Sequence, residues 1–81
     1  DALSEACADT ALLGLALDLN YAGSTTTNVL GGTCTILPIE SGSHEKTIKV
    51  IGTKGDTITN TKIVLRTTDF TIISWDEVET F

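Results

Sequence analysis

The sequence lacks most of what catalysis, nucleic-acid binding or membrane insertion would require. Its 81 residues include one histidine, one tryptophan, one proline and five basic residues, against eleven acidic ones. The formal charge of −6 argues against non-specific binding to nucleic acids or anionic membranes. No apolar run approaches the roughly 18 residues of a membrane-spanning helix. Neither a signal peptide nor an Asn-x-Ser/Thr glycosylation motif is present.

No constellation of catalytic residues can be recognised. His44, the only histidine, lies in a Ser-Gly-Ser-His turn, and a serine two residues away makes no triad without a buried orienting acid. Cys7 as a nucleophile would need an activating partner, but its neighbours in the expected helix are acids, which raise a thiol pKa. Residues 52–55 lack the context and ending of a phosphate-binding loop. We therefore predict that the protein is not an enzyme and uses no cofactor.

The two cysteines, Cys7 and Cys34, fall in a predicted helix and a predicted strand. A disulfide would suit this chain, because so small a domain buries only about 60% of its unfolded surface. In the chain-entropy model the closed loop would stabilise the fold by roughly 3–4 kcal/mol. The alternatives are two buried free thiols or a metal-binding pair, although a metal site is disfavoured by the absence of a CxxC motif and the single histidine. A disulfide would indicate an oxidising, extracytoplasmic location.

Residues 1–20 are predicted to form the helix around which the chain is organised. Alanine and leucine dominate this segment, and both are strong helix formers. From Ala11 onward the apolar residues continue most of the way around, so we expect the helix to be covered on nearly all sides. Gly14 costs about 1 kcal/mol relative to alanine and is expected to mark the close approach of a strand. The residues expected on one face are Leu3, Ala6, Cys7, Ala11 and Leu17.

After the helix, β-branched segments alternate with short turns, which favour antiparallel neighbours and a meander. Gly31-Gly32 is a two-residue hairpin signal, and Pro38 places its strand at an edge or ends it. We expect one α+β domain over residues 1–81, with an N-terminal helix packed on a four- to five-stranded antiparallel meander sheet over 24–75 and an acidic tail over 76–81. The expected strands are 24–30, 33–40, 46–53, 57–67 and 70–75.

Acidic residues near the end of the sequence are weak candidates for a calcium site. Their carboxylates could converge with backbone carbonyls on Ca²⁺, the kind of ligands this ion prefers. Because their spacing matches no ordered ligand loop, the alternative is a solvated acidic face or docking edge. The candidates are Asp69, Asp76, Glu77 and Glu79.

The basic residues lie on two strands that are expected to face each other, where they could form a stripe. The overall acidity disfavours nucleic-acid contact, and the alternative is charge that keeps the sheet soluble and limits aggregation. Trp75 and Phe81, near each other in the sequence, are candidate interface residues, and Trp75 could be an interface anchor. The alternative, which we favour, is a core aromatic that closes the sheet over the helix. The basic residues are Lys46, Lys49, Lys54, Lys62 and Arg66.

Four stretches together resemble the globular domains of bacterial type IV pilin-like proteins, the pilins and pseudopilins. The match covers most of the 81 residues. The resemblance implies the C-terminal half of a long helix packed on an antiparallel sheet. It also implies an apolar N-terminal helix behind a short leader that a prepilin peptidase removes. The stretches are Ser4–Cys7 running on to Asp18–Tyr21, Gly31–Ile36, Gly52–Asp56 followed by Ile63–Leu65, and Ser74–Val78.

The function that this resemblance implies is a structural subunit, a pilin or pseudopilin headgroup of an extracellular pilus-like filament. Its partners would be copies of itself or other pilin-like subunits. Membrane contact would occur only through the apolar N-terminal helix, which these residues do not include and which would hold the subunit in the inner membrane before assembly. We expect the chain to be the soluble part of something longer. The alternative is a small secreted binding module, an adhesin or inhibitor, with one disulfide.

Overall fold

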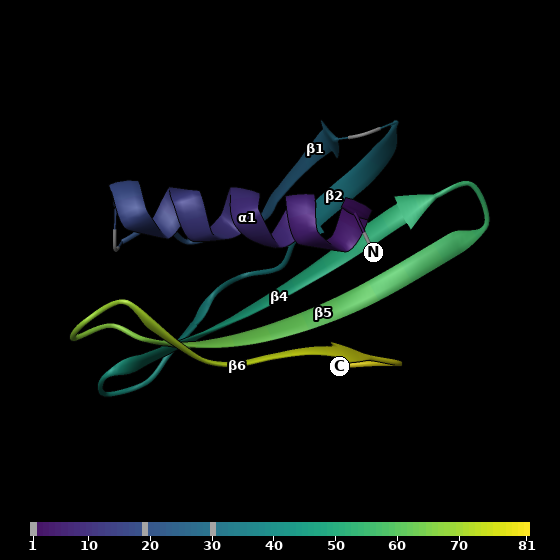
Figure 1. The fold of residues 1–81 in the computed structure, drawn as a ribbon. Helices are drawn as coiled ribbons and strands as arrows, with labels where there is room; N and C mark the ends of the chain where they lie inside the picture. The colour runs from purple at the N-terminus through teal and green to yellow at the C-terminus, as the bar shows by residue number, and fades with distance from the viewer. Residues whose placement is uncertain (1, 19, 30) are drawn as a thin grey trace.

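The computed structural model describes residues 2–18, 20–29 and 31–81. Within them, one N-terminal helix packs on an antiparallel sheet of six strands (Figure 1). Five strands follow the meander order β1-β2-β4-β5-β6, and the two-residue β3 pairs with β4. The predicted α+β class and antiparallel meander are confirmed. The elements are α1 (Ala2–Leu17), β1 (Thr25–Val29), β2 (Gly32–Ile36), β3 (Glu40–Ser41), β4 (Glu45–Lys54), β5 (Thr57–Arg66) and β6 (Thr71–Val78).

Strands β2 and β3 both pair with β4, and Pro38 lies in the gap between them. The backbone N–H of Leu37 still donates to the carbonyl of Lys49 at 3.0 Å, whereas proline has no N–H to donate. The strand therefore stops before Pro38, one of the two outcomes expected of this proline, and β2 ends at Ile36 rather than at residue 40. Gly32 was expected in the turn between the first two strands, but it pairs with Val29 and belongs to β2.

The core lies between one face of α1 and the sheet face that it covers. Leu15 from the helix meets alternate strand residues there, and Ile48 and Ile63 are direct cross-strand neighbours in β4 and β5. The helix approaches β1, β2, β4 and β5, but no described residue of α1 has its Cα within 8 Å of a β6 Cα. As Figure 1 shows, β6 lies beyond the strands that the helix covers.

A disulfide joins Cys7 in α1 to Cys34 in β2, which confirms the predicted pairing. The two Cα atoms are 5.4 Å apart, within the usual range of about 4.4–6.8 Å for disulfides. Both cysteines are fully buried, and 27 positions separate them along the chain. The covalent bond therefore fixes the helix to the half of the sheet that contains β1 and β2.

The helix ends at Leu17 rather than at residue 20. The carboxylate of Asp18 accepts a hydrogen bond from the backbone N–H of Asn20 (2.9 Å), and the Asp18 carbonyl accepts one from Tyr21 (2.9 Å). Aspartate side chains that bind the local backbone compete with helix continuation in this way. The close approach at Gly14 comes from Tyr21 and not from a strand, since a Cβ on Gly14 would lie 2.8 Å from the Tyr21 ring.

The expectation that α1 would be covered on nearly all sides is wrong. Leu13 is 60% exposed and Leu17 is 80% exposed, so Leu17 does not share the buried face as predicted. The reason is that the described fold has two layers, and a sheet covers only one side of a helix.

The last strand extends further than predicted, to Val78, so residues 76–78 are not part of a tail. Asp76 pairs with Lys62 across the β5–β6 ladder, where opposite charges are favourable. The strand begins at Thr71 because Phe70, with φ at 55°, belongs to the preceding turn. Residues 1, 19 and 30, which fall in the predicted helix and first strand, lie outside the described residues.

Candidate interaction surface

The described residues contain no cluster of three or more His, Cys, Asp or Glu side chains that could hold a metal ion. Of the calcium candidates, Asp69 lies in the β5–β6 turn, whereas Asp76 and Glu77 are consecutive in β6 and so point to opposite faces. The carbonyl of Glu79 accepts a hydrogen bond from the Asn60 side chain at 2.8 Å. The fold therefore does not bring these four residues together.

Two exposed carboxylates are held in their charged form by neighbours. A hydrogen bond with Lys49, and the charge of its ammonium group, lower the pKa of Glu40. The two groups are 2.5 Å apart. The pKa of Asp69 is lowered first by a side-chain hydrogen bond with Thr71 and then by the charge of Arg66, at 3.7 Å. Of the two carboxylates, Glu40 therefore has the closer cationic partner.

The basic residues do not form one stripe. Lys49 and Lys62 are direct cross-strand neighbours on the sheet face away from the helix. Lys46 pairs with the buried Leu65 and thus belongs to the helix side, where its Nζ donates to the Ser41 hydroxyl at 2.9 Å. Because Glu40 contacts Lys49 and an aspartate pairs with Lys62, the ladder carries charges of both signs.

The two aromatic candidates lie on opposite faces of the sheet. Trp75 pairs with Ile63, a core residue, so Trp75 is on the helix side. It remains 37% exposed, because α1 does not extend over β6. Phe81 lies on the other side, with its ring centroid 5.9 Å from the Nζ of Lys49. Trp75 therefore does not close the sheet beneath the helix, and it does not form a joint site with Phe81.

Four exposed apolar side chains follow β6 and the turn before it. Phe70, Ile72, Ile73 and Trp75, which we call the β6 surface, are between 37% and 44% exposed. A bulge near Ile73 interrupts the ladder, since Leu65 pairs with Ile72 whereas Val64 pairs with Ser74. In the described sheet β6 is an edge strand, paired only with β5. An exposed, apolar edge strand is typical of a site where another chain binds.

Sequence reasoning singled out Trp75 but missed Ile72 and Ile73. The available signal was the pair of consecutive isoleucines, because successive residues of a strand point to opposite faces and only one face meets the helix. The exposed leucines Leu13 and Leu17 were also missed, although they lie four residues apart on the same side of α1.

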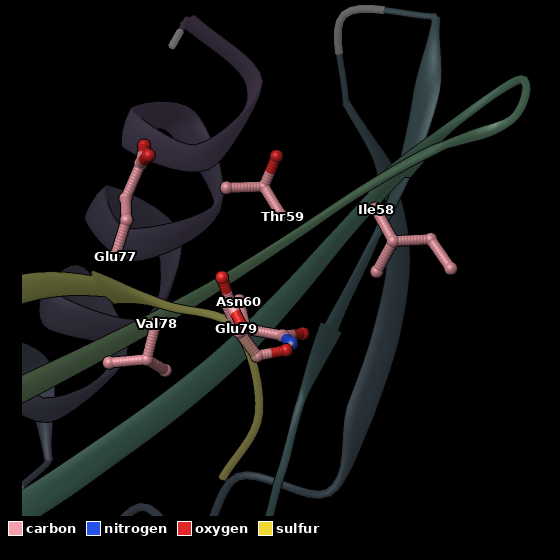
Figure 2. A pocket seen from close by; sticks show the side chains of 6 residues that line it. All are labelled: Ile58, Thr59, Asn60, Glu77, Val78 and Glu79. Carbon is pink, nitrogen blue, oxygen red and sulfur yellow. Dashed lines mark hydrogen bonds between the residues drawn. The ribbon is translucent and has the colours of Figure 1, made fainter.

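A hollow of about 430 Å³ lies at the end of β6, beside β5. In Figure 2, Thr59 and Glu77 point to one side of the sheet, and Ile58 and Val78 point to the other. The hollow therefore spans the strand ends rather than lying on one face of the sheet. The same view shows which residues of β6 lie on the helix side of the sheet. Its lining residues are Ile58, Thr59, Asn60, Glu77, Val78 and Glu79.

Comparisons of the chain with family models, with curated proteins and with solved structures give no match. Among the described residues no helix has both the length and the apolar character needed to cross a bilayer. The described surface offers groups for non-covalent contacts: an open strand edge, exposed aliphatic and aromatic side chains, and carboxylates beside them.

Proposed function

We propose that the chain is the globular part of a structural subunit of an extracellular filament of the type IV pilin-like class, a pilin or pseudopilin headgroup. Its partners are copies of itself or other pilin-like subunits, and the subunit resides in the inner membrane before assembly. The observation that carries the proposal is the β6 surface, an apolar strip along an open sheet edge.

The fold supports the proposal, because the resemblance implies a helix on an antiparallel sheet and the structure has that arrangement. Exposed apolar side chains support it further. Full burial of a Leu, Ile or Phe side chain contributes about 1.5–3 kcal/mol, so partial burial of Ile72, Ile73 and Trp75 between subunits would contribute several kcal/mol per contact. A filament repeats such a contact at every subunit.

The test uses the native protein, recovered both from cell membranes and from material sheared off the cell surface. Intact mass and N-terminal sequencing identify what precedes Asp1. An additional apolar helix with a processed N-terminus, found in the sheared fraction, is the expected result. A mature chain that starts near Asp1 and is recovered free in the medium would overturn the proposal.

The open edge of β6 favours a second candidate, a small secreted binding module such as an adhesin or inhibitor. Edge strands bind extended peptides through main-chain hydrogen bonds, and neighbouring side chains supply specificity. Under this candidate the isolated domain binds a defined ligand tightly while it remains a monomer. Sedimentation of the protein with and without its ligand separates this outcome from assembly into filaments.

A further inference from the structure

The two free edges of the described sheet, β1 and β6, are suited to pair with each other when they belong to two copies of the chain. In the described sheet, β1 and β6 each pair with a neighbour on one side only. Each neighbouring pair along the meander is antiparallel, so β1 and β6 run in the same direction. A second copy placed beside the first, and rotated so that the twist of the sheet continues, would therefore bring its β1 alongside β6 as a parallel strand.

The position of the helix supplies the reason for such a neighbour. Helix α1 lies mainly over β4 and β2, reaches β5 and β1 less extensively, and does not reach β6 (Figure 1). Ile72 and Trp75 lie on the helix side of β6, since they pair with the core residues Leu65 and Ile63. If β1 of a second copy lay beside β6, the helix-side residues of that strand, Thr25, Thr27 and Val29, would lie next to these two exposed side chains and cover part of them.

The lengths of the two edges also match. Beyond the bulge, β6 offers an uninterrupted ladder over Ser74–Val78, and β1 spans five residues, Thr25–Val29. A bulge disrupts strand pairing locally, so it limits the stretch of β6 that can accept another strand to this segment.

Charge selects β1 as the partner of β6, rather than a second β6. Asp76 and Glu77 lie in the segment of β6 that is free to pair, whereas β1 consists of Thr-Thr-Thr-Asn-Val and has no charge. Pairing two β6 strands would bring these carboxylates close together in two chains of net charge −6. By the alternation of faces, Asp76 would instead lie on the same side as Thr26, whose hydroxyl can donate to a carboxylate.

We propose that β6 of one copy binds β1 of a second copy as a parallel edge strand, with the helix-side residues of that β1 covering part of Ile72 and Trp75. This inference rests on the proposed function, in which copies of the chain assemble. The contact joins two different surfaces, so it leaves a free β6 and a free β1 at the two ends. Such a heterologous contact propagates into an open chain of subunits or closes into a ring.

Two single substitutions block one edge each. Thr26→Asp places a carboxylate on β1 opposite the acidic segment of β6, and Trp75→Lys places on β6 the residue that native sheets use to protect edges. Both positions are exposed, and circular dichroism and thermal unfolding establish that each variant is folded. Thr57→Asp, at the exposed start of β5, is the matched control for the added charge.

We expect the unaltered chain and the Thr57→Asp control to associate as concentration rises in sedimentation experiments. Each edge variant alone should associate at least about tenfold more weakly, which corresponds to about 1.4 kcal/mol. An equimolar mixture of Thr26→Asp and Trp75→Lys should form one-to-one dimers and nothing longer, because one variant retains β6 and the other retains β1.

Tryptophan fluorescence reports the same contact. The mixture contains only the Trp75 of the Thr26→Asp variant, since the chain has one tryptophan. Its emission should shift to shorter wavelength when the Trp75→Lys variant is added. Restored association in the double variant Thr26→Asp with Asp76→Lys would support the placement of residues 26 and 76 on the same side of the paired strands.

Two results would overturn the inference: a mixture that stays monomeric, or single variants that associate like the control. Its failure is distinct from that of the proposed function. If the native protein is recovered from sheared filaments while the mixture stays monomeric, only the β6–β1 contact is wrong. If the mixture dimerises while the native protein is found only free in the medium, only the filament is wrong.

Discussion

The two edge strands of the sheet, β1 and β6, differ in composition and in how the helix lies relative to them. At the β1 edge, the strand is five residues long and rich in threonine, the helix lies nearby, and a disulfide fixes that helix to β2. At the β6 edge, the strand has eight residues, carries Ile72, Ile73 and Trp75, and no described part of the helix lies over it. The β1 edge is polar and lies next to the strand that the disulfide joins to the helix. The β6 edge carries exposed apolar side chains that the described helix does not cover.

The difference between the two edges follows from the widths of the sheet and of the helix. Neighbouring strands lie about 4.8 Å apart, so five paired strands extend over roughly 19 Å from the first to the last. A helix with its side chains is only about 10–12 Å wide. A single helix placed over β2 and β4 therefore leaves an outer strand uncovered, and the position of the disulfide determines that this strand is β6. Apolar residues at such a place are available to a partner.

Loss of the disulfide should have the largest effect on stability. It removes the covalent bond that fixes the helix to β2, next to the β1 edge of the sheet. Replacing both cysteines by serine, or reducing the native protein, should destabilise the fold by roughly 3–4 kcal/mol in the chain-entropy model. For a domain of this size that lowers the melting temperature by more than about 10 °C. Thermal unfolding followed by circular dichroism, with and without reductant, measures the shift.

Hydrogen exchange in the reduced protein locates the effect. Amides of α1, β1 and β2 should lose protection before those of β5, because the disulfide joins α1 to β2. A melting temperature that reduction leaves unchanged would contradict the stabilising role of the bond.

A matched pair of substitutions tests the contrast between core and edge. Ile63 is fully buried in β5, whereas Ile72, on the same side of the sheet in β6, is 42% exposed. Ile63→Ala should cost about 2–5 kcal/mol of unfolding free energy, because it opens a cavity in the core. Ile72→Ala, at a position that water already reaches, should cost less than about 1 kcal/mol.

Urea unfolding of the two variants at low protein concentration gives both values. The comparison would be wrong if Ile72→Ala were as destabilising as Ile63→Ala, since β6 would then be part of the folding core rather than a surface strand.

The sequence was sufficient for the fold because its strongest signals are local. The Ala- and Leu-rich segment specifies a helix, and short turns between β-branched segments specify antiparallel neighbours. The Cys7–Cys34 pair follows from the small size of the domain and from the lack of other partners. These features need no knowledge of how the helix lies on the sheet.

The surface depends on where the helix lies, which no local pattern contains. Trp75 was expected to close the core, and an aromatic at that position would do so if the helix crossed β6. Gly14 indicated a close contact, but its partner, the Tyr21 ring, follows the helix in sequence and returns to it through a turn. The candidate basic stripe failed because Lys46 and Lys49 are three residues apart in one strand and therefore point to opposite faces.

The smallest expected effect concerns one carboxylate from each half of the sheet. Glu40, beside β4, and Asp69, before β6, both have lowered pKa values. For a group whose folded pKa lies below its unfolded value, the stabilisation is present above the unfolded pKa and is lost as pH falls through the folded pKa. Stability should therefore decline slightly as the pH falls below about 4.

Salt should distinguish the two carboxylates, because their partners differ in kind. The lowering at Glu40 comes first from its hydrogen bond and charge contact with Lys49, so Lys49→Met should return this pKa toward its ordinary range, and high salt should do so in part. The lowering at Asp69 comes first from its hydrogen bond with Thr71 and should respond less to salt than to Thr71→Val. Carboxyl chemical shifts followed by NMR titration report each group separately. If Lys49→Met left the Glu40 titration unchanged, the ion pair would be a contact without thermodynamic effect, as many exposed pairs are.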